Sequence, residues 1–313
     1  MPLMAFIVYD TDLKVNIQDI RVNNILIQYP ALFDSADKAS ITSQKSFLRL
    51  TILHAIVLLV GTLLSINVIP TKEYSMLVAV FYILALVFTY KLGKNRYEKN
   101  WYNGRAIAES IKTSTWKYCM RATPYADDIS MQVPNANFRN MLTQIIKSNS
   151  ELGEIVQAHQ STGEQITATM QDIRAMNLED RKSYYLEHRI DEQREWYATK
   201  ASINNKMHNR WFIGLMLTQG LALLCVLLRI AYPEWQYWPT DAFALGAAFI
   251  LGWMQLKKHN ELSSSYSLTA QEIGIIRGGI ESVRTEEQFS EYVSSTEMAF
   301  SREHTQWVAR QNQ

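Results

Sequence analysis

The sequence predicts an all-α membrane protein in which two transmembrane helical hairpins, four spans in all, are joined to long cytoplasmic helices that form a bundle. Three observations predict this class. Apolar residues are concentrated in four long runs, lysine and arginine gather at one end of these runs, and the 313 residues include only 7 prolines and 12 glycines. So few prolines and glycines argue against disorder and against a turn-rich β fold.

Four stretches of the chain contain no aspartate, glutamate, lysine or arginine, and they cover residues 50–71, 74–90, 211–228 and 242–256. A membrane-spanning helix needs about 20 predominantly apolar residues, and the first three stretches have that length. The fourth reaches it when residues 238–241 are included. We therefore expect spans at about 50–70, 74–91, 211–230 and 239–256. The alternative is a large soluble bundle with buried core helices, and the sharply charged flanks of the runs argue against it.

Basic residues flank the predicted hairpins at their open ends, and they are Lys45, Arg49, Lys91, Lys94, Arg96, Lys99, Lys200, Lys206, Arg210, Lys257 and Lys258. The hairpin turns carry only Lys72 and Arg229, whereas the second turn is crowded with the aromatic residues Tyr232, Trp235, Tyr237 and Trp238. Because excess lysine and arginine mark the cytoplasmic side, both hairpins should point outward and both termini should be cytoplasmic. The opening of the chain lacks the basic region and the apolar core of a signal peptide.

The two hairpins follow one plan. Ala36–Ile41 precedes the first hairpin with the sequence ADKASI, and Ala198–Ile203 precedes the second with ATKASI. Proline-free stretches follow the hairpins, at residues 94–122 and 259–311. We interpret the chain as two copies of one unit, each with a leading helix, a two-span hairpin and a trailing helix. The predicted parts are a first unit at 1–150, a polar connector at 151–177 and a second unit at 178–313.

Between the hairpins the sequence predicts a less regular region. Pro124 and Pro134 interrupt the helix after Thr123, and a short helix is expected at 137–148. From Leu178 the chain should form one long helix that runs into the third span.

Tryptophan-centred motifs lie in the leading and trailing helices of both units. The first unit contains Tyr29-Pro30-Ala31-Leu32-Phe33, the ADKAS segment, Gln44, a Trp101-Tyr102-x-x-Arg105-Ala106-x-Ala108-Glu109-Ser110-x-Lys112 segment and Trp116-Lys117-Tyr118. The second contains Arg189-Ile190-x-x-Gln193-x-x-Trp196-Tyr197-x-x-Lys200-Ala201-x-x-Asn204, Tyr266-x-x-x-Ala270, Glu297, Glu303 and Trp307. These motifs resemble two different subtypes of the SLATT family, the SMODS- and SLOG-associating two-transmembrane effector domains. The resemblance spans about residues 24–310.

The resemblance implies a function that composition and spacing do not show. It implies a membrane effector of a bacterial, antiphage conflict system, pore-forming or membrane-disrupting, in the bacterial inner membrane. It also implies activation by a nucleotide second messenger or by an upstream defence protein. We expect the lipid bilayer and further copies of the chain as partners, with no cofactor. The competing class is a membrane-anchored scaffold without a pore.

Small and polar residues form stripes along the predicted spans: Thr51, His54, Leu58, Gly61 and Ser65 in the first, and Gly214, Thr218, Ala222 and Cys225 in the third. Polar residues in a membrane face the bundle interior or a water path. The stripes therefore line a pore, with His54 as a titrating gate, or they pack helices closely. Packing is the favoured interpretation for the stripe of the third span and for Ala244, Ala248 and Gly252 of the fourth span.

A second set of candidates lies in the helices next to the spans, and its members are Trp101, Arg105, Glu109, Trp116, Trp196, Lys200 and Trp307. In the first unit these residues share one helix face, together with Lys112. The functional interpretation is a cytoplasmic platform for gating contacts or for a ligand whose base stacks on the aromatic rings. The alternative, which we favour, is helix–helix packing, because aromatic residues dominate such interfaces.

Other functions find little support in the sequence. No zinc-protease, dinucleotide, P-loop or nucleophile-elbow motif occurs, so we do not expect an enzyme. The 6 histidines and 2 cysteines have no metal-ligand spacing. The net charge of +1 gives no field for nucleic acid. A transporter is weakened because Asp241, the acidic residue nearest a span interior, lies at an edge.

Overall fold

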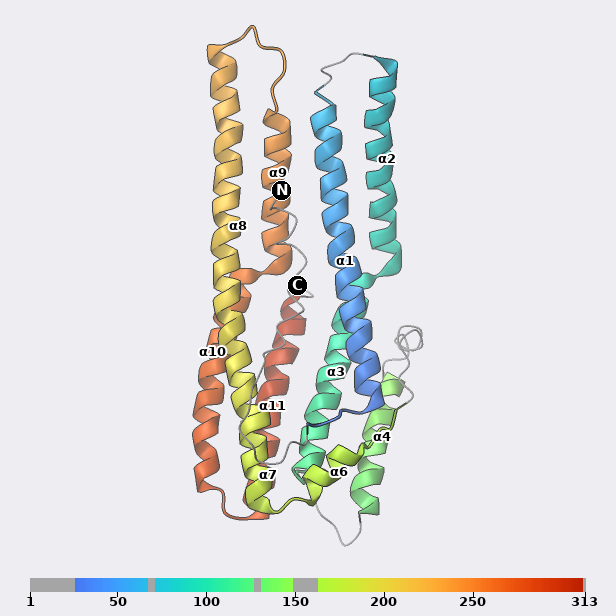
Figure 1. Ribbon diagram of the computed structural model, residues 1–313, viewed down its shortest axis with the longest axis vertical. Coiled ribbons are helices and arrows are strands. Elements are labelled where there is room, and N and C mark those ends of the chain that lie inside the picture. The colour runs from blue at the N-terminus through green and yellow to red at the C-terminus, as the bar shows by residue number, and fades with distance from the viewer. Residues whose placement is uncertain (1–25, 67–70, 127–130, 149–162, 312–313) are drawn as a thin grey trace.

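The computed structural model describes residues 26–66, 71–126, 131–148 and 163–311, with side chains described as far as Ser301. Within these ranges the chain is all-helical and contains no β-strand, as the sequence predicts. The molecule is elongated (Figure 1): two helical hairpins stand side by side at one end, and a bundle of helices forms the other end.

The first half of the chain contributes α1 (Ala31–Leu64), α2 (Lys72–Asn95), α3 (Tyr97–Cys119), α4 (Gln132–Ser148) and α6 (Ala168–Ala175). The second half contributes α7 (Leu178–Tyr185), the π-helical segment η2 (Leu186–Asp191), α8 (Glu192–Ala231), α9 (Thr240–Lys257), α10 (His259–Gly278), the 3-10 segment η3 (Gly279–Ser282) and α11 (Glu286–Gln311).

Three helices are long and apolar enough to cross a membrane: α1, the α2–α3 rod and the rod formed by α7, η2 and α8. Helix α9, with 18 residues, is not among the three, so the structure does not confirm the fourth predicted span. Within α2, Ala85 alone is buried, so the apolar side chains of this helix face outward. Such exposure is unfavourable in water and favourable in lipid.

The two hairpins share one geometry at their base. Arg96 joins α2 to α3, Lys258 joins α9 to α10, and both residues are left-handed, with φ of 43° and 45°. Residues other than glycine rarely adopt this conformation. Arg96 follows Ala39 by 57 residues, and Lys258 follows Ala201 by the same 57. The repeat inferred from the ADKASI and ATKASI segments therefore extends to the backbone of both junctions.

After each junction the trailing helix continues away from the hairpin tip and packs along the leading helix: α3 packs on α1, and α10 packs on α8. The Ser40 hydroxyl donates to the Trp101 carbonyl over 3.0 Å, and the Ser263 hydroxyl donates to the Ala201 carbonyl over 2.9 Å. Gly104 permits the close approach in the first unit, because a Cβ atom there would lie 3.1 Å from the Ala36 carbonyl oxygen.

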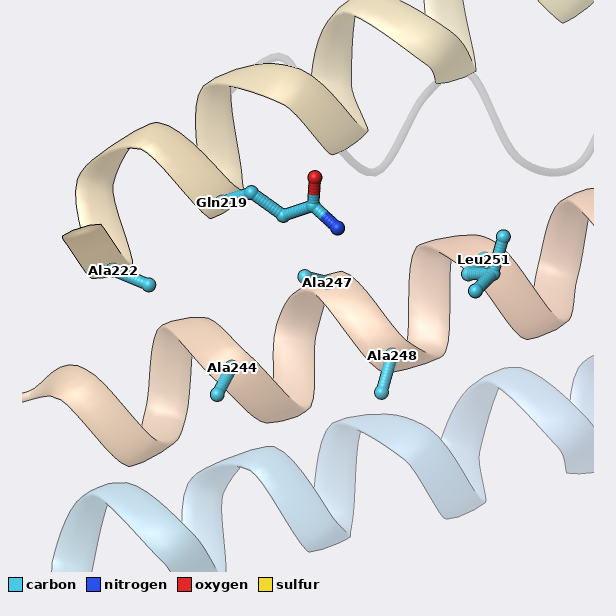
Figure 2. Close-up of a pocket in the computed structure, with 6 residues that line it drawn as sticks. All are labelled: Gln219, Ala222, Ala244, Ala247, Ala248 and Leu251. Carbon is cyan, nitrogen blue, oxygen red and sulfur yellow. The ribbon is translucent and has the colours of Figure 1, made fainter.

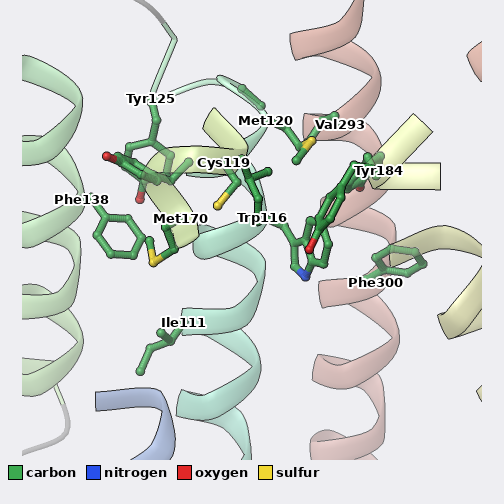
Figure 3. Packing of buried hydrophobic residues seen from close by; sticks show 14 of the residues in the cluster. Ile111, Trp116, Cys119, Met120, Tyr125, Phe138, Met170, Tyr184, Val293 and Phe300 are labelled. Carbon is green, nitrogen blue, oxygen red and sulfur yellow. The ribbon is translucent and has the colours of Figure 1, made fainter. Parts of the chain in front are cut away.

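The four long helices of the hairpins stand in the order α2, α1, α9, α8, with α1 contacting α9 (Figure 1). At the other end, α3 packs against α11, so the trailing helices of the two units meet there. Figure 3 shows the core of this end, which gathers aromatic and aliphatic side chains from α3, α4, α6, α7 and α11. Members with no exposed surface or nearly none include Trp116, Tyr118, Met120, Phe138, Met170, Tyr185 and Phe289.

Several boundaries differ from the sequence-based expectation. Helix α1 ends at Leu64, before the expected limit of the first span at residue 70, and the Ser65 N–H donates to the Gly61 carbonyl. Helix α4 begins at Gln132 and holds Pro134 in its first turn, a position at which a missing N–H costs little. The stretch 259–311 is two antiparallel helices, because the chain turns through η3 and Val283.

Candidate functional site

The polar stripe of the first span faces the partner helix of its own hairpin. His54 Nε2 lies 3.1 Å from Thr89 Oγ1 of α2. Gly61 is buried, and a Cβ atom at this position would lie 3.4 Å from Phe81. Thr51 and Ser65 donate to carbonyls of their own helix, those of Phe47 and Thr62. In this structure the stripe therefore forms part of the contact between α1 and α2.

The stripe of the third span lies beside α9. The Thr218 hydroxyl donates to the Gly214 carbonyl over 2.7 Å, and a Cβ atom on Gly246 would meet the Thr218 methyl group at 3.5 Å. Gly214 and Gly252 have open space where a Cβ atom would be. Cys225 is half-buried and its thiol is free.

A cavity of about 350 Å³ lies where α8 and α9 face each other, and it is lined by Gln219, Ala222, Ala244, Ala247, Ala248 and Leu251. Figure 2 shows the Gln219 side chain extending from α8 toward α9 near Ala247, whereas the side chains of Ala244 and Ala248 point away from α8. Ala244 and Ala248 were predicted to pack helices and Ala222 belongs to the stripe of the third span, whereas Ala247 and Gln219 were not singled out. Gln219 could have been found in the sequence, because it is an amide in an otherwise apolar run and polar side chains are rare within spans.

The predicted platform of the first unit divides into two parts. Trp101 stacks on Tyr102, with ring centroids 4.7 Å apart, and lies 6.4 Å from Phe47 on α1. Arg105 Nη2 lies 2.6 Å from Glu109, and Arg105 Nη1 lies 3.9 Å from Asp37 on α1. These contacts hold α3 against α1, just below the junction at Arg96.

Trp116 is 1% exposed and belongs to the core of the bundle. Its indole N–H donates to the Tyr29 hydroxyl over 3.0 Å. Burial raises the pKa of Tyr29, and the nearby charge of Arg189 opposes this effect. Trp116 therefore packs between helices in this structure.

The platform residues of the second unit remain more accessible. Trp196 is 39% exposed, its ring lies 5.6 Å from that of Tyr266, and the Lys200 ammonium lies 5.9 Å from the Trp196 ring centroid. Trp307 lies on α11, and its side chain is outside the described residues. Trp196 and Lys200 thus form a surface that a partner or ligand can reach.

A buried ion pair stands at the centre of the bundle, and the sequence did not single it out as a site. Arg189 lies in the π-helical segment η2, and its Nε and Nη2 atoms donate to the Glu297 carboxylate of α11 over 2.8 and 2.7 Å. The Tyr185 hydroxyl donates to the same carboxylate over 2.9 Å. Arg189 is 2% exposed and Glu297 is fully buried. We call these three residues the central clamp.

The electrostatics of the central clamp preserve its charges. Burial opposes the charge of Arg189, but the Glu297 carboxylate raises the pKa of the guanidinium above its usual value. Burial, followed by the charge of Glu297, also raises the pKa of Tyr185, so the phenol stays a hydrogen-bond donor. Among the described side chains, Nη1 of Arg189 has no hydrogen-bond partner. One donor of the clamp is thus left unsatisfied, which has a free-energy cost.

The central clamp touches both halves of the chain. The Arg189 guanidinium lies 4.7 Å from the Phe300 ring of α11 and 6.0 Å from the Trp116 ring of α3. Lys112, on the α3 face that carries Trp116, has its pKa lowered by burial, and Glu109 counteracts this effect. The clamp therefore connects the trailing helix of each unit to the helix that leads into the third apolar run.

Two further buried arginines fasten the carboxyl end of α3. Arg174 Nη1 donates to the Tyr118 carbonyl over 2.6 Å, and Arg181 Nη1 donates to the Met120 carbonyl over 3.0 Å. Arg181 also pairs with Glu286 at the start of α11. Carbonyls at a helix end lack N–H partners within the helix, and these guanidinium groups supply the missing hydrogen-bond donors.

Comparison with protein families gives two matches in tandem. Residues 30–182 match the family model described as "SMODS and SLOG-associating 2TM effector domain 3", and residues 185–307 match "SMODS and SLOG-associating 2TM effector domain 1". The two matches meet beside η2, close to Arg189. No curated protein and no solved structure matches this chain.

Proposed function

The chain belongs to the SLATT family of two-transmembrane effector domains, with two different subtypes in tandem, and from this premise we propose that it is an oligomeric, pore-forming membrane effector of a bacterial antiphage system. An upstream signal would open or disrupt the membrane through it. The family and the long apolar helices make it a membrane protein.

The proposed membrane arrangement has four spans, formed by α2, α9 and the upper parts of α1 and α8. At 1.5 Å per residue, the 18 residues of α9 cover about 27 Å, close to the thickness of a hydrocarbon core. Stacked aromatic rings at the second hairpin turn, Tyr232 on Trp235 and Trp235 on Trp238, fit an interfacial belt. The basic residues at the hairpin bases support a cytoplasmic location for the helical bundle and for both termini.

One observation carries the proposed mechanism: the helical rod Leu178–Ala231 is 54 residues long and connects the central clamp to the third span. Because η2 and the span belong to one rod, a signal that moves the Arg189–Glu297 contact also turns or tilts the span. A packed helix transmits such a displacement because its interfaces switch between discrete packing arrangements and do not deform gradually.

A pore in this proposal requires several copies of the chain. In one copy the stripe of α1 is occupied by α2, with His54 beside Thr89, so a conducting path needs both assembly and rearrangement. The Gln219 amide supports assembly, because an amide in lipid is stabilised by a hydrogen bond from another helix. The accessible Trp196 and Lys200 surface supports a signal that arrives as a base-containing ligand or as a protein.

Ion flux provides the test. The full chain is reconstituted in liposomes that contain a self-quenched dye and a potassium gradient, and the upstream protein or nucleotide of the system is added. We expect dye release or potassium flux that depends on the added signal. Absence of both with every tested signal contradicts the pore.

A membrane-anchored scaffold is the second candidate, and one observation favours it: the His54 and Gly61 contacts are satisfied within a single hairpin. The variant His54→Leu with Ser65→Leu separates the two. A pore loses or changes its conductance, whereas a scaffold keeps its protective activity in a phage-challenge assay.

A further inference from the structure

Five basic residues surround the base of the first hairpin, where the apolar parts of α1 and α2 end. They are Lys45, Arg49, Lys91, Lys94 and Arg96, and all five are exposed. We call them the basic collar.

The antiparallel packing of α1 and α2 places the collar within a band about 10 Å high along the molecule. His54 lies beside Thr89, and the Ser40 hydroxyl contacts the Trp101 carbonyl. Counted from the contact between His54 and Thr89, Arg49 lies five residues down α1 and Lys94 five residues along α2, so these two residues are level. The left-handed residue Arg96 marks the same level, at which the chain leaves the apolar hairpin.

The collar faces away from the contact between the two helices. Successive residues of an α-helix are rotated by about 100°. Lys45 and Arg49 are therefore turned away from the side of α1 that carries His54, and Lys91 and Lys94 from the side of α2 that carries Thr89. The ammonium of Lys94 lies 5.6 Å from the Tyr90 ring, which supports its stem along the helix.

The charges of the collar have no acidic partner among the side chains that the structure describes. None of its residues forms a salt bridge within the described parts of the chain. Glu98, which follows closely after Arg96, is engaged by the Tyr102 hydroxyl. In the second unit, by contrast, Arg210, Lys257 and Lys258 at the hairpin base each already have an interaction partner.

We propose that the basic collar binds the phosphate groups of anionic phospholipids in the leaflet that surrounds the first hairpin. The ligand is a phosphodiester anion held in a lipid surface, because the collar residues are exposed and lie at the edge of an apolar wall. Exposed cations at this depth attract anionic headgroups, and the attraction weakens with each cation that is removed. This inference does not depend on pore formation, since a scaffold with the same hairpin carries the same collar.

The test uses native mass spectrometry of the full chain in a neutral detergent, titrated in parallel with phosphatidylglycerol and phosphatidylcholine. We expect bound phosphatidylglycerol to exceed bound phosphatidylcholine. In the variant Lys91→Gln with Lys94→Gln, the affinity for phosphatidylglycerol should fall roughly five-fold for each cation removed. The variant Lys91→Arg with Lys94→Arg keeps both positive charges and should retain the affinity for phosphatidylglycerol.

The matched control is Lys72→Gln with Arg229→Gln, which removes two cations from the hairpin turns and should leave the preference unchanged. Melting curves without added lipid show that each variant is folded. The proposal is overturned if the wild type does not prefer the anionic lipid, or if the turn variant loses the preference as strongly as the collar variant. Displacement of the lipid by inorganic phosphate at equal concentration overturns the assignment to a membrane lipid.

Discussion

Arg189 and Glu297 form a fully buried ion pair across the boundary between η2 and α11, with two hydrogen bonds of 2.8 and 2.7 Å between guanidinium and carboxylate. The two charges are desolvated together, so their attraction is largely offset by lost hydration. The pair therefore contributes little net stability but strongly disfavours any arrangement that separates its members. That property suits a contact that holds the bundle in one of two arrangements, one before and one after the signal.

Removing one member of the pair should destabilise the protein far more than removing both. Arg189→Met or Glu297→Met leaves a buried charged group without its partner, and we expect a loss of about 3–5 kcal/mol in the free energy of unfolding. Arg189→Met combined with Glu297→Met should recover most of that loss. Denaturation of the solubilised chain, analysed as a double-mutant cycle, measures the coupling. Additive losses would show that the two side chains do not act as a pair.

Gly104 should not tolerate a side chain. A Cβ atom there meets the Ala36 carbonyl oxygen, the Ser40 backbone nitrogen and the Ser40 Cβ, each at 3.1 Å. Gly104→Ala should therefore lower the melting temperature, because α3 must move away from α1.

Gly93 gives the matched control for this substitution, since nothing lies within 4 Å of a Cβ atom at this position of α2. Gly93→Ala should be neutral or stabilising by up to about 1 kcal/mol, as alanine favours the helix over glycine. Equal destabilisation by both substitutions would contradict the close approach of α3 to α1.

The stability of the bundle should depend on the protonation of His188. A hydrogen bond to Glu192 raises the pKa of His188 above its usual 6.5, against the effect of burial. Since the folded protein binds this proton more tightly than the unfolded chain, the stabilisation is complete below pH 6.5 and is lost as the pH rises through the folded-state pKa. The melting temperature of the wild type should exceed that of His188→Gln by more at pH 5.5 than at pH 8.5. A difference that stays constant over this range would contradict the linkage.

The contact between His54 and Thr89 should stabilise the first hairpin modestly. Hydrogen bonds between membrane helices contribute about 0.6 to 1.7 kcal/mol, so His54→Leu and Thr89→Val should each cost an amount in this range. The double variant should cost less than the sum of the two single variants. Unfolding in mixed micelles measures the three values, and Ser75→Ala, whose hydroxyl bonds only the Thr71 carbonyl of its own helix start, serves as the control.

The helical class, the duplicated units and the long rod from Leu178 could be predicted because each depends on a pattern along the chain. Runs of apolar residues reveal candidate spans, and the repeated ADKASI and ATKASI segments reveal the duplication. The rod is continuous from Leu178 to Ala231, as the absence of proline predicts. The family resemblance is likewise confirmed by two matches in tandem.

The central clamp could not be predicted in this way, because its members are 108 residues apart and only the packing of α11 brings them together. Arg189 and Glu297 both belong to the motifs that carry the family resemblance, but nothing in the sequence indicates that the two side chains meet or that both are buried. The π-helical segment also leaves no simple composition pattern in Leu186–Asp191. The turn at η3 was missed because the residues on both sides of Gly278 and Gly279 have a helical pattern and no proline marks the end of α10.

The equal spacing from Ala39 to Arg96 and from Ala201 to Lys258 persists although the hairpin tips differ in construction. Helix α9 is shorter than α2, while α8 extends further past the repeated motif than α1 does. The hairpin bases are thus the fixed ends of the duplicated segment, and the tips are where it has diverged without changing its overall length. Insertions at the tips should leave the coupling between leading and trailing helices in register, whereas one extra residue inside a helix below the tip would rotate every contact beneath it.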